Sequence, residues 1–84
     1  MIELVNDIPE LSKRIYTGQW KDGMKDSQGT YVFYDQFGNI KYKYIGGFKE
    51  GRFFGKGTHY TYDRNGNITK TQSGWWDDKF LGEK

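Results

Sequence analysis

The fold of this chain is decided by the stretch YTGQWKDG at residues 16–23, which recurs as YIGGFKEG at residues 44–51. The offset of 28 residues continues without a gap, because GNI at residues 38–40 returns at residues 66–68. A third, truncated copy supplies the matching residues Gly74, Trp76 and Asp78. Agreement at one fixed offset indicates a tandem repeat.

The composition favours strands over helices. Aromatic residues make up 19% of the chain and all hydrophobic residues together only 35%, so most of the apolar mass is aromatic. Twelve glycines against one proline indicate frequent turns with positive φ. The formal charge of +2 is too small and too mixed to indicate nucleic-acid binding by itself.

Each repeat carries two turn signals. DQFG at residues 35–38 and DRNG at residues 63–66 are typical of hairpin turns, in which Asp accepts backbone bonds and Gly takes the left-handed conformation. KDG at residues 21–23 and KEG at residues 49–51 also end in glycine. The strands expected between these turns span residues 15–20, 29–35, 39–48, 57–63 and 67–76. Consecutive hairpins predict an all-β protein, a single antiparallel meander sheet.

Alternation along residues 39–48 separates an apolar face from a mostly polar one. The apolar face carries Ile40, Tyr42, Tyr44, Gly46 and Phe48, and the other carries Lys41, Lys43, Ile45 and Gly47. Glycine is unfavourable inside a strand, yet one precedes each of Trp20, Phe48 and Trp76 by two residues. We expect these rings to lie across Gly18, Gly46 and Gly74.

The repeat resembles the membrane occupation and recognition nexus (MORN) repeat, with the pattern Tyr-x-Gly-x-Trp-x-x-Gly followed by Gly-x-Gly-Thr-Tyr. The first unit matches at Tyr16, Gly18, Trp20, Gly23, Gly29, Thr30 and Tyr31, but has Ser27 at the earlier glycine position. The second matches at Tyr44, Gly46, Phe48, Gly51, Gly55, Gly57 and Thr58. The resemblance covers about residues 16–82, or two and a half repeats, and implies a sheet of repeated hairpins used for binding.

The first 15 residues fall outside the repeat, so we divide the chain into an N-terminal cap at residues 1–15 and a repeat sheet at residues 16–84. The cap is either a short helix with Asp7 as its N-cap or a strand over residues 2–5. Either element can cover the exposed edge of the first repeat. The segment reads neither as a signal peptide nor as a membrane span, and we expect a cytoplasmic protein.

No residue constellation supports catalysis. The chain has no cysteine and one histidine, His59, at the place that Tyr31 holds in the first unit. A zinc site or a catalytic triad needs more ligands or partners than this. We therefore predict a protein that is not an enzyme, with neither cofactor nor metal.

Aromatic residues that the repeat does not require are candidate partner-binding residues. Phe53 and Phe54 stand where the first unit has Lys25 and Asp26, and Trp75 lies on the face that carries Thr69, Thr71 and Ser73. Rings on a polar face indicate a binding patch. The structural alternative is that they cover the open end of the sheet or pack under the N-terminal segment.

Basic residues are concentrated at Lys41, Lys43, Lys49, Arg52 and Lys56. Beside aromatics, a basic stripe suits an anionic lipid or single-stranded nucleic acid. The alternative is a solvated strand face on which lysine discourages edge pairing. We include Lys41, Lys43, Arg52 and Lys56 among the candidate partner-binding residues.

The leading hypothesis is a non-catalytic protein-binding module that occludes or scaffolds another protein through an aromatic and basic sheet face. Such a module would be a small adaptor or a stoichiometric inhibitor, of the kind that a phage or other mobile element encodes. Binding of anionic lipid or nucleic acid through the basic stripe is the second hypothesis. A structural homodimer through the sheet edges is the third.

Overall fold

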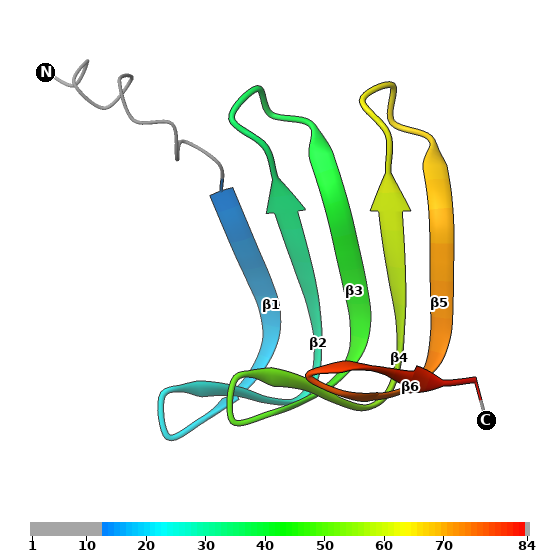
Figure 1. The fold of residues 1–84 in the computed structure, drawn as a ribbon. Helices are drawn as coiled ribbons and strands as arrows, with labels where there is room; N and C mark the ends of the chain where they lie inside the picture. The colour runs from blue at the N-terminus through cyan, green and yellow to red at the C-terminus, as the bar shows by residue number, and fades with distance from the viewer. Residues whose placement is uncertain (1–12, 84) are drawn as a thin grey trace, which may run out of the picture.

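The computed structural model describes residues 13–83, which form one six-stranded antiparallel sheet with its strands in sequence order (Figure 1). The strands are β1 (Lys13–Lys21), β2 (Met24–Tyr34), β3 (Ile40–Lys49), β4 (Arg52–Tyr62), β5 (Ile68–Asp77) and β6 (Lys79–Gly82). This part of the chain contains no helix, and hence none that could cross a membrane. The predicted all-β meander of tandem hairpins is confirmed.

The Asp-x-x-Gly turns form as their chemistry predicts. The Asp35 Oδ1 atom accepts hydrogen bonds from the backbone N–H groups of Phe37 at 2.8 Å and Asn39 at 3.0 Å. Asp63 makes the same two bonds, at 2.8 and 3.0 Å, in the next unit. Gly38 takes a φ of 87°, which glycine adopts without steric cost. These backbone bonds hold the pKa values of the Asp35 and Asp63 carboxyls below their usual range.

The strands bend sharply toward one face of the sheet. Residues four apart in a straight strand are about 13 Å apart. Nevertheless, the Tyr44 and Phe48 rings meet edge to face with centroids 5.2 Å apart, and those of Tyr16 and Trp20 meet at 5.0 Å. Figure 1 shows the lower ends of the hairpins folded over from the upper strands. The inside of this bend is called the core face, and the opposite side the outer face.

A row of glycines crosses the sheet between these ring pairs. The cross-strand register aligns one glycine from each of the first five strands, namely Gly18, Gly29, Gly46, Gly57 and Gly74. A Cβ atom on Gly46 or Gly57 would run into the Tyr44 hydroxyl, whose O–H donates to the Gly47 carbonyl at 2.9 Å. Tyrosines lie against these glycines, Tyr16 against Gly18 and Gly29 and Tyr44 against Gly46 and Gly57. Of the three rings expected to lie across a neighbouring glycine, that of Trp76 reaches Gly57, the register partner of Gly74.

The core is a small aromatic cluster on the core face. Tyr44, Phe48 and Trp76 are its buried members, and Tyr16, Tyr31, Phe53 and Phe80 pack against them. The Trp76 indole N–H donates to the Gly57 carbonyl at 3.0 Å, so its one polar atom is satisfied. The predicted apolar face of β3 and β5 is thus the face that carries the core.

Several predicted strand bounds are wrong. β2 and β4 begin five residues before the predicted residues 29 and 57, and β6 was not predicted. Ser27 and Gly55 lie near the start of these strands and have positive φ values of 64° and 81°. A positive φ interrupts the regular strand conformation, so the residues before Ser27 and Gly55 were not predicted to belong to the strands. Of the proposed N-terminal cap, residues 1–12 lie outside the described residues, and residues 13–15 begin β1.

Candidate functional site

Exposed aromatic and basic side chains gather on the outer face of β4 and β5. Trp75 is 44% exposed and lies directly opposite Lys56 in the register, and Phe54 is 39% exposed on the same face. The Lys49 ammonium lies 5.0 Å from the centre of the Phe54 ring, within the range of a cation–π contact. We call Lys49, Phe54, Lys56 and Trp75 the outer patch.

The repeat does not require the two rings of the outer patch. At the offset of 28 residues, Phe54 corresponds to Asp26 and Trp75 corresponds to Gly47. Both of those positions lie in strands that pair in the same way. The rings are therefore additions to the fold.

Phe53 lies elsewhere, and our expectation that it faces the polar side is wrong. It is opposite Phe48 in the register, on the core face, and its ring stacks on that of Tyr44. The predicted strand began at residue 57, whereas β4 begins at Arg52 and includes both phenylalanines. Alternation along β4 assigns Phe53 to the core face and Phe54 to the outer face. Phe53 therefore does not belong to the outer patch.

The basic residues proposed as one stripe are dispersed. Lys56 is exposed in the outer patch, and Lys43 is half-buried on the outer face between Val32 and Tyr60. Lys41 lies at the end of the sheet that carries the Asp-x-x-Gly turns. Arg52 pairs with Lys49 beside the β3–β4 turn, at the opposite end of the sheet from Lys41, and lines a hollow of about 190 Å³. No single surface brings these four cations together.

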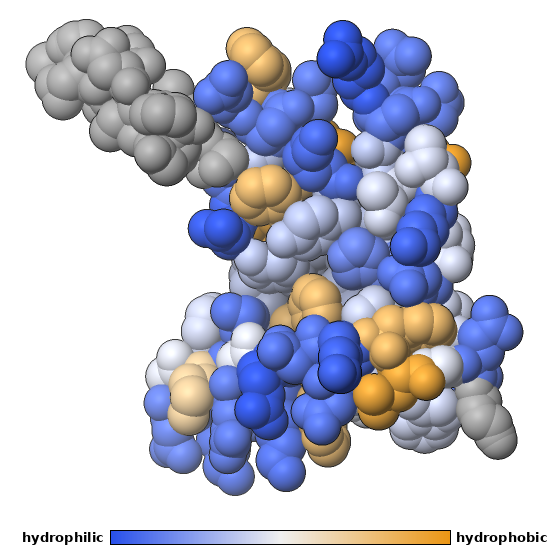
Figure 2. Space-filling model, viewed as in Figure 1, coloured by the Kyte–Doolittle hydropathy of each residue, from blue (hydrophilic) through white to orange (hydrophobic). Residues whose placement is uncertain are grey.

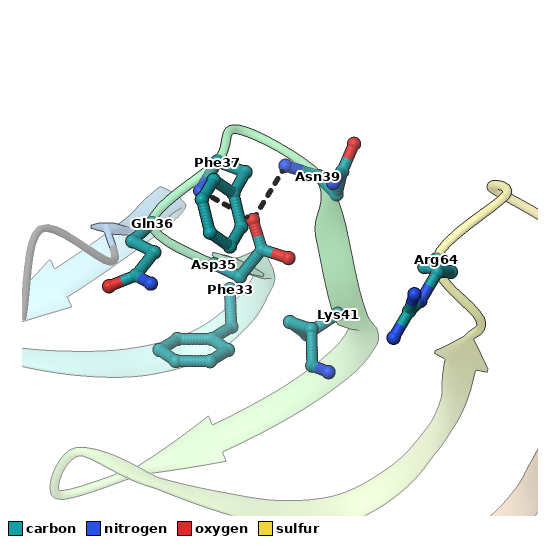
Figure 3. Close-up of a pocket in the computed structure, with 7 residues that line it drawn as sticks. All are labelled: Phe33, Asp35, Gln36, Phe37, Asn39, Lys41 and Arg64. Atoms are coloured by element: carbon teal, nitrogen blue, oxygen red, sulfur yellow. Dashed lines mark hydrogen bonds between the residues drawn. The ribbon is translucent and has the colours of Figure 1, made fainter. Parts of the chain in front are cut away.

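A larger hollow of about 600 Å³ lies between the two Asp-x-x-Gly turns (Figure 3). We call it the tip hollow, and its lining residues are Phe33, Asp35, Gln36, Phe37, Asn39, Lys41 and Arg64. Phe37 is 78% exposed, more than any other large hydrophobic side chain in residues 13–83. Lys41 comes from the start of β3, and Arg64 comes from the turn between β4 and β5. Two neighbouring units therefore supply one cation each.

Phe37 and Arg64 are not among the candidate residues predicted from the sequence, although the repeat contains a signal for both. Asn65 stands where Phe37 would repeat, and Gln36 stands where Arg64 would repeat. Comparing every position at the offset of 28 residues, turns included, identifies both as departures from the repeat. Figure 2 shows apolar side chains separated by hydrophilic ones on the face in view, which fits several small surfaces better than one large apolar patch.

His59 is part of an aromatic row on the core face. Its ring lies 5.0 Å from that of Tyr42 and 5.7 Å from that of Trp76, and its buried Nδ1 atom has no hydrogen-bond partner among residues 13–83. Burial, and then the nearby Lys70 ammonium, lower the pKa of His59, so the ring is held neutral. Within residues 13–83 no group of three or more His, Cys, Asp or Glu side chains could hold a metal ion.

The bent meander, its glycine row and its repeated turns define a class of protein, the tandem β-hairpin repeat proteins. A sequence model of the MORN repeat matches residues 16–36 and 44–66, about half of the chain. The chain belongs to the MORN repeat family. MORN repeats are non-enzymatic modules that bind proteins or membranes. Comparisons with curated proteins and with solved structures found no match.

Proposed function

We propose that this protein is a non-catalytic protein-binding module that contacts its partner through the outer patch. The observation that carries the proposal is the exposure of Phe54 and Trp75, at 39% and 44%, where the repeat itself has Asp26 and Gly47. Exposing rings that the fold does not need is unfavourable in water unless a partner covers them.

The physical properties of the patch favour a protein partner. Aromatic rings held by rigid strands bury a large area at a small entropic cost, and Trp is enriched among residues that dominate interface energies. Lys49 and Lys56 border the rings, so an acidic rim on the partner would set orientation and speed association. Lys41 lies at the other end of the sheet and Lys43 is half-buried, which disfavours a single anionic-lipid or nucleic-acid site.

Affinity capture from the native cell with variant baits tests the proposal. We expect Phe54→Ala and Trp75→Ala each to weaken the partner's binding about tenfold or more, because truncating an interface anchor costs over about 1.4 kcal/mol. Ile68→Ala is the matched control, since Ile68 is 52% exposed at the other end of β5. Equal capture by the unmodified chain and by all three variants would exclude the outer patch.

Adaptor and inhibitor roles differ in their effect on the partner. A stoichiometric inhibitor, such as a phage or another mobile element could encode, abolishes the partner's activity at one copy per partner. An adaptor leaves that activity intact and joins a second protein to the complex. Titration of the purified partner's activity with this chain distinguishes the two roles.

A further inference from the structure

The tip hollow is a second surface with its own chemistry, at the far end of the sheet from the β3–β4 turn. Figure 3 shows the Arg64 side chain extending from its turn toward Lys41, which lies between Arg64 and Phe33 in this view. Phe37 stands above that space on the turn between β2 and β3, and is 78% exposed. The hollow therefore combines two cations with an accessible ring.

A β-bulge places the lysine. Phe33 pairs with Tyr42 and Tyr34 pairs with Ile40, so Lys41 is the extra residue between these pairs. A bulge redirects a side chain out of the regular alternation. Lys41 thus lines the tip hollow together with Phe33, although strict alternation would put these two residues on opposite faces.

The electrostatics of the hollow favour an anion. Asp35 is the one carboxylate in the lining, and its Oδ1 atom already accepts two backbone hydrogen bonds. Lys41 already acts on Asp35, since its charge helps to lower the pKa of that carboxyl, but Lys41 and Arg64 together outweigh the one negative charge. Arginine binds a carboxylate through two parallel hydrogen bonds, and the side-chain amide of Gln36 is an additional donor in the lining.

This combination occurs once in the two complete units. At the offset of 28 residues, Lys41 corresponds to Thr69, and Arg64 and Phe37 correspond to Gln36 and Asn65. The Asp-x-x-Gly turn forms equally well with either set, because its hydrogen bonds come from the Asp side chain and the backbone. None of these three side chains is needed for the turn.

We propose that the tip hollow binds an acidic residue of a protein partner together with an apolar ring beside it. The carboxylate lies between Lys41 and Arg64, and the partner's ring packs on Phe37. The site is separate from the outer patch, and it rests on the proposed function only in taking a protein as the partner.

The probe is a capped Phe-Asp dipeptide, with capped Phe-Asn as its neutral counterpart. Both are titrated into the full chain labelled with ¹⁵N, and amide shifts are followed. We expect a Kd in the range of about 1–10 mM for Phe-Asp, as fits so small a ligand, with shifts confined to residues 33–41 and 63–67. Phe-Asn should bind about fivefold more weakly or not at all. Equal binding of the two dipeptides would overturn the proposal.

Three variants borrow their residues from the repeat itself, namely Lys41→Thr, Arg64→Gln and Phe37→Asn. We expect each variant to weaken Phe-Asp binding about fivefold, because each removes a charge or ring that contacts the dipeptide. The rest of the spectrum should stay unchanged, because the equivalent position of the other unit already carries the new residue. Lys79→Gln and Leu81→Ala, at exposed positions of β6 outside both proposed sites, are controls that should leave dipeptide binding unchanged. Loss of dipeptide binding in these controls, or full binding in the three variants, overturns the tip hollow without affecting the outer patch.

Discussion

The rings of Tyr44 and Phe53 stack with their centroids 4.0 Å apart and their planes inclined by 18°. Tyr44 lies before the bend of β3, and Phe53 lies at the start of β4 in the folded-over hairpin. In the first unit Lys25 takes the place of Phe53, with its ammonium 5.8 Å from the centre of the Tyr16 ring. A ring stack in one unit and a cation–π contact in the other thus hold equivalent hairpins against the sheet.

The neighbouring residues Phe53 and Phe54 should respond differently to truncation. Phe53→Ala removes a ring packed in the aromatic cluster, and we expect it to lower the free energy of unfolding by about 3 kcal/mol. Phe54→Ala removes an exposed ring and should cost less than about 1 kcal/mol. Urea denaturation followed by tryptophan fluorescence measures both values. Similar losses in the two variants would contradict this assignment of faces.

Ser27 should be a point of strain. It has a φ of 64°, whereas the equivalent residue in the second unit is Gly55, with a φ of 81°. The left-handed conformation costs a residue with a side chain about 1–2 kcal/mol, partly offset by the chain entropy that glycine loses on folding. We expect Ser27→Gly to raise the free energy of unfolding by roughly 0.5–1 kcal/mol.

Gly55→Ser is the matched reverse change, since an added Cβ at Gly55 would contact no atom within 4 Å in the part of the chain that the structure describes, its two chain neighbours aside. It should therefore destabilise the protein by a similar amount, through the backbone conformation alone. If thermal unfolding midpoints shift in the same direction for both variants, the strain argument fails.

Tyr44 should make the protein sensitive to alkali. Burial raises the pKa of its hydroxyl from 10.0 to about 12, so folding favours the neutral phenol. Stability is then unaffected below pH 10 and falls as the pH rises toward 12, because the unfolded chain releases the proton first. Urea unfolding from about pH 8 to about pH 11 measures this loss, and Tyr44→Phe should reduce it. An unchanged slope in Tyr44→Phe would assign the effect to Tyr16 and Tyr31, whose pKa values are also raised.

His59 should make the protein sensitive to mild acid. Its pKa lies below the ordinary 6.5 because burial, and then Lys70, disfavour the charged ring. The unfolded chain therefore takes up a proton first, and stability falls as the pH drops below 6.5. His59→Tyr installs the first unit's residue and should flatten the stability profile between about pH 5 and about pH 7.5, above the range in which carboxyls titrate.

Much of the fold was predictable because it is set by local chemistry. Asp35 and Gly38 form their turn from contacts within five residues, and the repeat then propagates hairpin after hairpin. The early parts of β2 and β4 were not predictable in this way. Serine and glycine are typical of turns, and Ser27 and Gly55 both have a positive φ. Nevertheless, both residues remain paired within the sheet.

The candidate sites were only partly predictable. Phe54 and Trp75 are candidates because each departs from the repeat, and both are exposed. Lys41 was also selected, but its neighbours in the tip hollow, Phe37 and Arg64, were not. Their grouping depends on two turns, 28 residues apart in sequence, that the sheet brings to the same end.

The sequence by itself determined the repeat, the turns and the succession of antiparallel strands, because each depends on residues close together in the chain. The tertiary structure decided which rings form the core and which meet solvent. That outcome depends on the bend at the glycine row and on cross-strand register, which placed Phe53 opposite Phe48 and left Phe54 on the other face. Register is set by the packing of whole strands, so the faces of two adjacent phenylalanines could be assigned only once the strands were paired.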